Sequence, residues 1–78
     1  MLKIRFYGKL REIFGESIEV EGKFKNIEEL ANFLAEKEKI IEKLKDYLLF
    51  SINKRQADFK DKINDGDEIA IFVTPTGG

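Results

Sequence analysis

Two segments near opposite ends of the chain alternate residues with a period of two. In residues 2–7, Leu, Ile and Phe alternate with Lys, Arg and Tyr; in residues 69–73, Ile, Ile and Val alternate with Ala and Phe. A strand has this period because successive side chains point to opposite faces of a sheet. Shorter patterns predict further strands at residues 17–21, 48–52 and 55–57, the last as a sheet edge.

One longer helix is predicted between the second and third strands. Its apolar stripe has helical spacing and consists of Ile27, Leu30, Ala31 and Leu34. Asn26 precedes the stripe as a capping residue, and Glu29 follows three positions later in a variant of the capping box. The stripe lapses at residues 36–39 and resumes at Ile40, which predicts a helix of about three turns and then a break or a second short helix.

The order of these elements predicts the fold class. A helical turn is expected at residues 9–14, ended by Gly15, so a hairpin, a crossover helix and a second hairpin follow one another. This order buries one sheet face against one main helix, in an α+β domain with a mixed sheet of four to five strands. We predict one domain at residues 1–73 and a flexible, reactive tail at residues 74–78, which has no apolar anchor.

Composition argues against several kinds of chemistry within the chain itself. There is no Cys and no His among the 78 residues, which removes thiolate zinc sites, a cysteine nucleophile and the commonest general base. The carboxylates of residues 58–67 lack the spacing of a calcium loop, so no metal and no bound cofactor are expected. A net charge of -1 argues against nucleic acid as a partner.

The apolar runs are too short to suggest a membrane partner. None approaches the roughly 20 residues that span a bilayer, and residues 1–5 alternate charge with hydrophobe, unlike a signal peptide. We therefore expect a cytoplasmic protein that is not catalytic on its own.

The last residues of the sequence are the strongest candidate for a reactive group. Gly77 and Gly78 have no Cβ, so an end built from them can enter a channel too narrow for other residues. Pro75 stiffens the base of this tail and Thr76 keeps it polar. Five extended residues reach roughly 17 Å. A carboxylate at Gly78 would react only after adenylation by a separate enzyme; the alternative is a frayed end without function.

Two aromatic residues are predicted to face away from the helix near the base of the tail. If the first and last strands are parallel neighbours, Tyr7 and Phe72 lie close together, which suits a protein interface. The alternative is that the two rings only pack on each other. Arg11 and the acidic turn at residues 65–68 are candidates for polar contacts with a partner, with solvated charge as the alternative.

Several motifs resemble one known family. Residues 4–12, IRFYGKLRE, resemble the first strand and Leu-Arg-Glu turn of the molybdopterin synthase small subunit. Residues 65–72, DGDEIAIF, resemble its last turn and strand, residues 76–78 its terminus, and Asn53 its strand-end Asn. The family commonly has Pro-Pro-Val before its last three residues, whereas residues 73–75 are Val-Thr-Pro.

The resemblance implies a fold and a mechanism. The fold is a ubiquitin-like β-grasp, in which the first and last strands lie parallel in the middle of the sheet. An adenylating enzyme of the ubiquitin-activating type uses ATP on Gly78, and a sulfur donor protein then converts the acyl adenylate to a thiocarboxylate. The tail enters the large subunit of molybdopterin synthase, where sulfur passes to cyclic pyranopterin monophosphate to form the dithiolene. Two small and two large subunits are implied.

Three other functions remain open. A sulfur carrier for thiamine thiazole synthesis shares the fold and terminus, but its members lack the turn found at residues 10–12. A ubiquitin-like modifier would join Gly78 to lysines of other proteins. A non-reactive interaction domain would make no use of the glycines.

Overall fold

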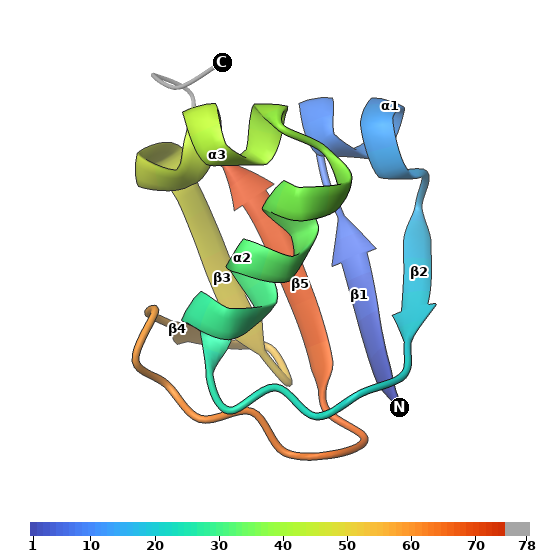
Figure 1. Ribbon diagram of the computed structural model, residues 1–78, viewed down its shortest axis with the longest axis vertical. Coiled ribbons are helices and arrows are strands. Elements are labelled where there is room, and N and C mark those ends of the chain that lie inside the picture. Colours follow the sequence, from blue (N-terminus) through green and yellow to red (C-terminus); the bar gives the residue numbers. More distant parts are fainter. Residues whose placement is uncertain (75–78) are drawn as a thin grey trace.

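The computed structural model describes residues 1–74. The strands and α-helices lie where the sequence predicts them, and one short 3-10 helix was not predicted (Figure 1). In chain order they are β1 (Leu2–Phe6), α1 (Lys9–Phe14), β2 (Ser17–Val20), α2 (Ile27–Lys37), α3 (Ile40–Leu44), the 3-10 helix η1 (Lys45–Tyr47), β3 (Leu48–Ile52), β4 (Arg55–Ala57) and β5 (Glu68–Val73).

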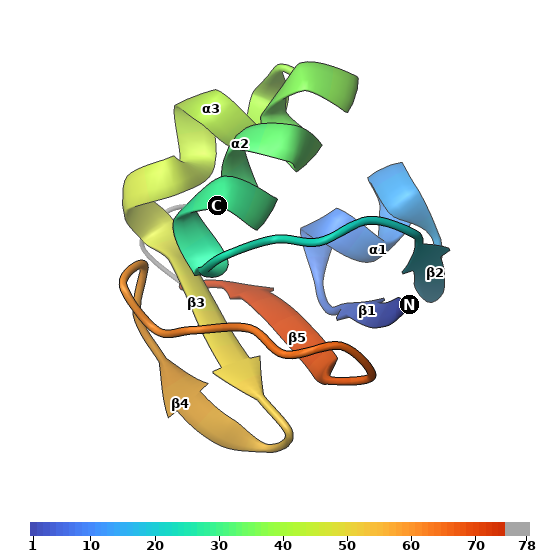
Figure 2. The ribbon, with the colours of Figure 1, turned by 60° about the horizontal axis from the view of Figure 1, so that its bottom comes forward.

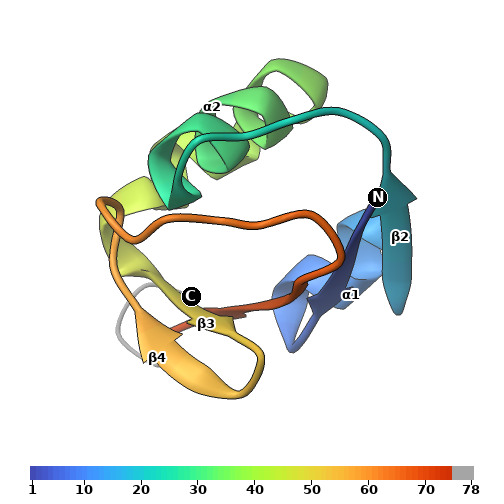
Figure 3. The same ribbon diagram turned by 90° about the horizontal axis from the view of Figure 1, so that it is seen from below.

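The five strands form one mixed sheet in the order β2-β1-β5-β3-β4. The central pair, β1 and β5, is parallel, and the other pairs are antiparallel. The helices α2 and α3 lie on one side of the sheet, as Figures 2 and 3 show. This arrangement confirms the predicted α+β class and the β-grasp topology with parallel first and last strands.

The core lies between the sheet and α2. Nine of the predicted inward-facing residues are buried: Leu2, Ile4, Phe6, Ile69, Ile71, Ile27, Leu30, Ala31 and Leu34. Val73, the last inward residue of β5, is only partly buried, at the end of the strand. Phe50 is buried as well, and four other phenylalanines pack against the core from its edges: Phe14, Phe24, Phe33 and Phe59. This burial supplies the main stabilisation of the domain.

The ends of the helices follow the predicted caps with one difference. The Asn26 Oδ1 accepts a hydrogen bond of 3.0 Å from the Glu29 N–H, as predicted. The Glu29 carboxylate, however, accepts from the Lys25 N–H at 2.7 Å, one residue before the position expected in a capping box. After α2 the backbone is extended at Glu38 (φ -138°, ψ 109°), so the interrupted stripe corresponds to a second short helix, α3.

Asn53 joins the end of β3 to the start of β5. Its backbone adopts φ 50°, in the left-handed region. Its side chain accepts from the Glu68 N–H at 3.0 Å and donates to the Asp67 carboxylate at 2.9 Å. These bonds fix the strand that leads to the tail.

Candidate functional site

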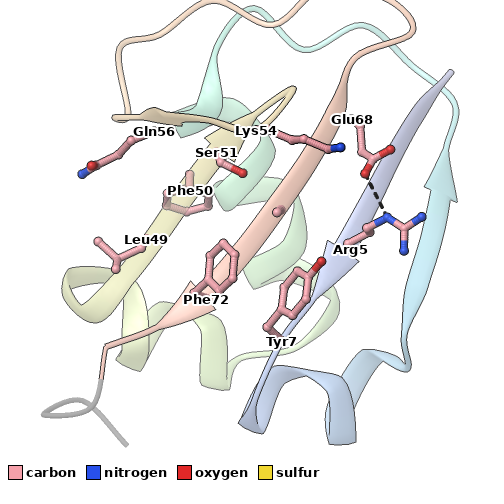
Figure 4. A pocket seen from close by; sticks show the side chains of 10 residues that line it. Arg5, Tyr7, Leu49, Phe50, Ser51, Lys54, Gln56, Glu68 and Phe72 are labelled. Carbon is pink, nitrogen blue, oxygen red and sulfur yellow. Dashed lines mark hydrogen bonds and ion pairs between the residues drawn. The ribbon is translucent and has the colours of Figure 1, made fainter.

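The sheet face opposite the helices carries a row of apolar side chains that are exposed or half-buried. Tyr7 follows β1, Phe72 lies near the end of β5, and Leu49 is paired with Phe72 in the β3–β5 register. Phe72 is 38% exposed and Leu49 is 44% exposed. We call Tyr7, Leu49 and Phe72 the apolar patch; Figure 4 shows the three side chains side by side. They line an open hollow of about 720 Å³.

The two aromatic rings of the patch are stacked. The Tyr7 and Phe72 ring centroids are 4.6 Å apart and the planes differ by 11°. Their proximity follows from the parallel strand pair, because Phe6 is in register with Ile71 and the Tyr7 N–H donates to the Ile71 carbonyl at 3.1 Å. The predicted proximity is confirmed. The rings pack on each other, as the alternative interpretation expected, and Phe72 remains partly exposed, so a role of the pair in an interface stays a prediction.

Arg11 lies beside this pair. Its guanidinium carbon is 5.6 Å from the centroid of the Tyr7 ring, and its Nε donates to the Phe6 carbonyl at 3.4 Å. A guanidinium over an aromatic face is attracted by the ring quadrupole. The three residues predicted to bind a partner are therefore neighbours, with Arg11 at the rim of the patch.

The far end of the same hollow is charged. The Arg5 Nε and the Glu68 carboxylate form an ion pair at 2.9 Å across β1 and β5 (Figure 4). Lys54, which has φ 72°, also lines this end. From the sequence, Glu68 was a candidate for polar contacts with a partner, with solvated charge as the alternative; its ion pair with Arg5 and the place of Leu49 in the patch were not predicted. Alternation in β3 places Leu49 outward, which is the signal that could have found it.

The base of the predicted tail lies at the same end of the sheet as the patch. Figure 1 shows β5 ending near α1 and α3. Thr74, the first tail residue, donates its backbone N–H to the Tyr47 carbonyl at 2.9 Å. The remaining predicted site residues, Pro75, Thr76, Gly77 and Gly78, lie outside the described residues.

Within residues 1–74 the patch offers a surface for contact with a partner. No group of three or more acidic side chains in this part of the chain could hold a metal ion. In the same part, none of the helices has the length and apolar character needed to cross a membrane. Chemistry at a terminal carboxylate would need activating groups from another protein.

Comparisons with known proteins give the family. Residues 4–78 match the ThiS family. The chain is 33% identical to the molybdopterin synthase sulfur carrier subunit of Escherichia coli (strain K12) and 35% identical to that of Haemophilus influenzae, with the whole of each chain covered. It is also similar to a chain in the protein–protein complex of subunits 1 and 2 of molybdopterin-converting factor from Helicobacter pylori 26695, with 27% identity, a TM-score of 0.68, and 99% and 97% of the two chains covered.

Proposed function

This chain belongs to the ThiS family, and we propose that it is the sulfur carrier subunit of a molybdopterin synthase. The observation that carries the proposal is its similarity over its full length to two relatives named as such subunits. The pair Gly77-Gly78 at the end of that alignment is the part of the sequence suited to the chemistry.

In the proposed reaction Gly78 is the reacting residue. Its carboxylate attacks the α-phosphorus of ATP in an activating enzyme of the ubiquitin-activating type, and pyrophosphate leaves. Sulfide from a sulfur donor protein then attacks the carbonyl carbon, and AMP leaves with the carboxyl oxygen, so that a thiocarboxylate remains. The chain binds no cofactor for these steps, because its partners supply the nucleotide site and the acid–base groups.

The thiocarboxylate then donates sulfur within the large subunit. Residues 75–78 would enter that subunit, and the absence of a Cβ at Gly77 and Gly78 suits a narrow channel. Sulfur passes there to cyclic pyranopterin monophosphate, which becomes the dithiolene. The Helicobacter pylori relative, whose structure is a complex of two subunits, supports a large-subunit partner.

We assign docking of that partner to the apolar patch and Arg11. Exposed aromatic residues are enriched at interfaces and contribute most when they are surrounded by a polar rim. The rim here consists of Arg11 on one side and the Arg5–Glu68 pair on the other. A partner seated on the patch would lie beside the end of β5, from which the tail continues.

Mass spectrometry tests the chemistry directly. The protein is incubated with the activating enzyme, ATP and the sulfur donor, and its intact mass should increase by about 16 Da, because sulfur replaces one oxygen. A variant that lacks Gly78 should show no increase and, with the large subunit, should form no dithiolene. Dithiolene formation by that variant at the wild-type rate would contradict the proposal.

The same reconstitution separates the alternatives. Sulfur transfer to a thiazole synthase, with none to the pterin, would identify the thiamine carrier. Isopeptide-linked conjugates of Gly78 on many proteins would identify a modifier. An unchanged mass under every condition would identify a non-reactive domain.

A further inference from the structure

The pairing of β3 with β5 continues past the ends of the two strands. The antiparallel register runs from Ile52 opposite Ile69 to Leu48 opposite Val73. One step further, the Thr74 N–H donates to the Tyr47 carbonyl at 2.9 Å. Thr74 is therefore attached to the sheet by its backbone although it lies outside β5.

The acceptor of this bond is itself firmly placed. Tyr47 ends η1, and the next residue, Leu48, is 8% exposed and begins β3. Leu44, just before η1, is 9% exposed in the same core. The Tyr47 carbonyl is thus held between two buried leucines, and a change of its position would require repacking of the core.

The residue after Thr74 is a proline. Pro75 has no backbone N–H, so it cannot donate a further bond to a neighbouring strand. Residues 75–78 are four in number, and a fully extended chain of four residues spans at most about 14 Å. The attachment of Thr74 to the sheet therefore sets an upper limit on how far Gly78 can lie from it.

We propose that the bond between Thr74 and Tyr47 is a positioning contact for sulfur transfer. The inference rests on the proposed function and adds that the sheet, through Tyr47, fixes the point from which the reactive tail leaves. A partner docked on the apolar patch must then present its reacting atoms within about 14 Å of Thr74. Holding the start of the tail removes conformations that would carry Gly78 elsewhere, and this raises the rate of reaction in the docked complex.

Two substitutions at Thr74 isolate the backbone bond. Thr74→Pro removes the N–H, whereas Thr74→Ala keeps it, and both remove the threonine side chain. We expect Thr74→Pro to form thiocarboxylate about tenfold more slowly than Thr74→Ala in single-turnover reactions with the activating enzyme. Both variants should bind that enzyme with the same Kd, because they differ from each other only at residue 74 and share the rest of the domain surface. Equal rates for the two variants would overturn the proposal.

Amide hydrogen exchange tests the attachment of Thr74 to the sheet without any sulfur chemistry. In the wild-type protein the Thr74 amide should exchange as slowly as that of Tyr7, which is also bonded at the end of a strand. Exchange at the rate of an unstructured peptide would overturn the positioning contact. If the wild-type protein shows this protection and forms no thiocarboxylate, the proposed function fails while the attachment of Thr74 stands.

Discussion

The Tyr7 ring lies flat against the Phe72 ring, with centroids 4.6 Å apart, on the sheet face that the helices leave open. Each ring limits the rotamers of the other, so the pair is ordered before any partner arrives. Ordered side chains lose little conformational entropy on binding. Burial of apolar area at this position therefore contributes more of its free energy to the affinity for a partner. The stack makes the apolar patch the strongest candidate for the energetic centre of an interface.

Replacement of Phe72 by Ala should weaken binding of the large subunit. The change removes the ring that contacts both Tyr7 and solvent, and truncation of an aromatic residue at an interface centre costs about 1–3 kcal/mol. The Kd should rise by about five- to 150-fold, measured by titration calorimetry.

Ile40→Ala is the matched control for this variant. Ile40 is 39% exposed, close to the 38% of Phe72, but it lies on α3, in the helical layer. Its truncation should leave the Kd unchanged. An equal loss of affinity in the two variants would show that the effect is general and not located on the sheet face.

The fold could be predicted because its main signals are local. Alternation in residues 2–7 and 69–73, the stripe of α2 and the cap at Asn26 each depend on residues close together in the sequence. The donor to the Glu29 carboxylate was misplaced by one residue, because the Lys25 N–H donates to it and not the Asn26 N–H. Such a choice depends on side-chain geometry that periodicity does not contain.

The site could be predicted only where topology was sufficient. The first and last strands of the chain are parallel neighbours, which places Tyr7 next to Phe72, and this proximity was predicted. The pairing of Leu49 with Phe72 and the bond from Thr74 to Tyr47 depend on the register of β3 against β5. Register between segments about 25 residues apart follows from packing of the whole sheet, so these contacts were not foreseen.

Asn53→Ala should destabilise the domain by about 1–2 kcal/mol. It removes two side-chain hydrogen bonds, and the Cβ at φ 50° then stays strained without those bonds to offset it. Asn53→Gly loses the same bonds but accepts the positive φ, so its loss should be smaller. Urea denaturation measures both free energies of unfolding. A larger loss for Gly than for Ala would contradict the backbone part of this explanation.

Asn26→Ala should lower the free energy of unfolding by about 1 kcal/mol, because the Glu29 N–H at the start of α2 loses its side-chain acceptor. Asn26→Gly should lower the free energy of unfolding by only a few tenths of a kcal/mol, because glycine lets water reach the helix end. Thermal unfolding followed by circular dichroism ranks the three proteins. Unfolding of Asn26→Ala at the wild-type temperature would show that the cap makes no contribution.

The ion pair between the Met1 ammonium and Asp65 predicts an acid-dependent stability. The ammonium, by its hydrogen bond and then its charge, holds the pKa of the Asp65 carboxyl below its ordinary value of 3.8. A carboxyl with a lower pKa in the folded state stabilises the fold above the unfolded pKa, and the stabilisation is lost as the pH falls through the folded pKa.

Asp65→Asn should therefore be less stable than the wild-type protein at neutral pH, and the difference should shrink as the pH falls below 3.8. Urea denaturation across this range measures it. Acetylation of the Met1 amino group removes the other partner, so it should destabilise the wild-type protein and leave Asp65→Asn unaffected. A constant difference between wild type and variant down to about pH 2 would contradict the pairing, because protonation would then leave the contribution of Asp65 intact.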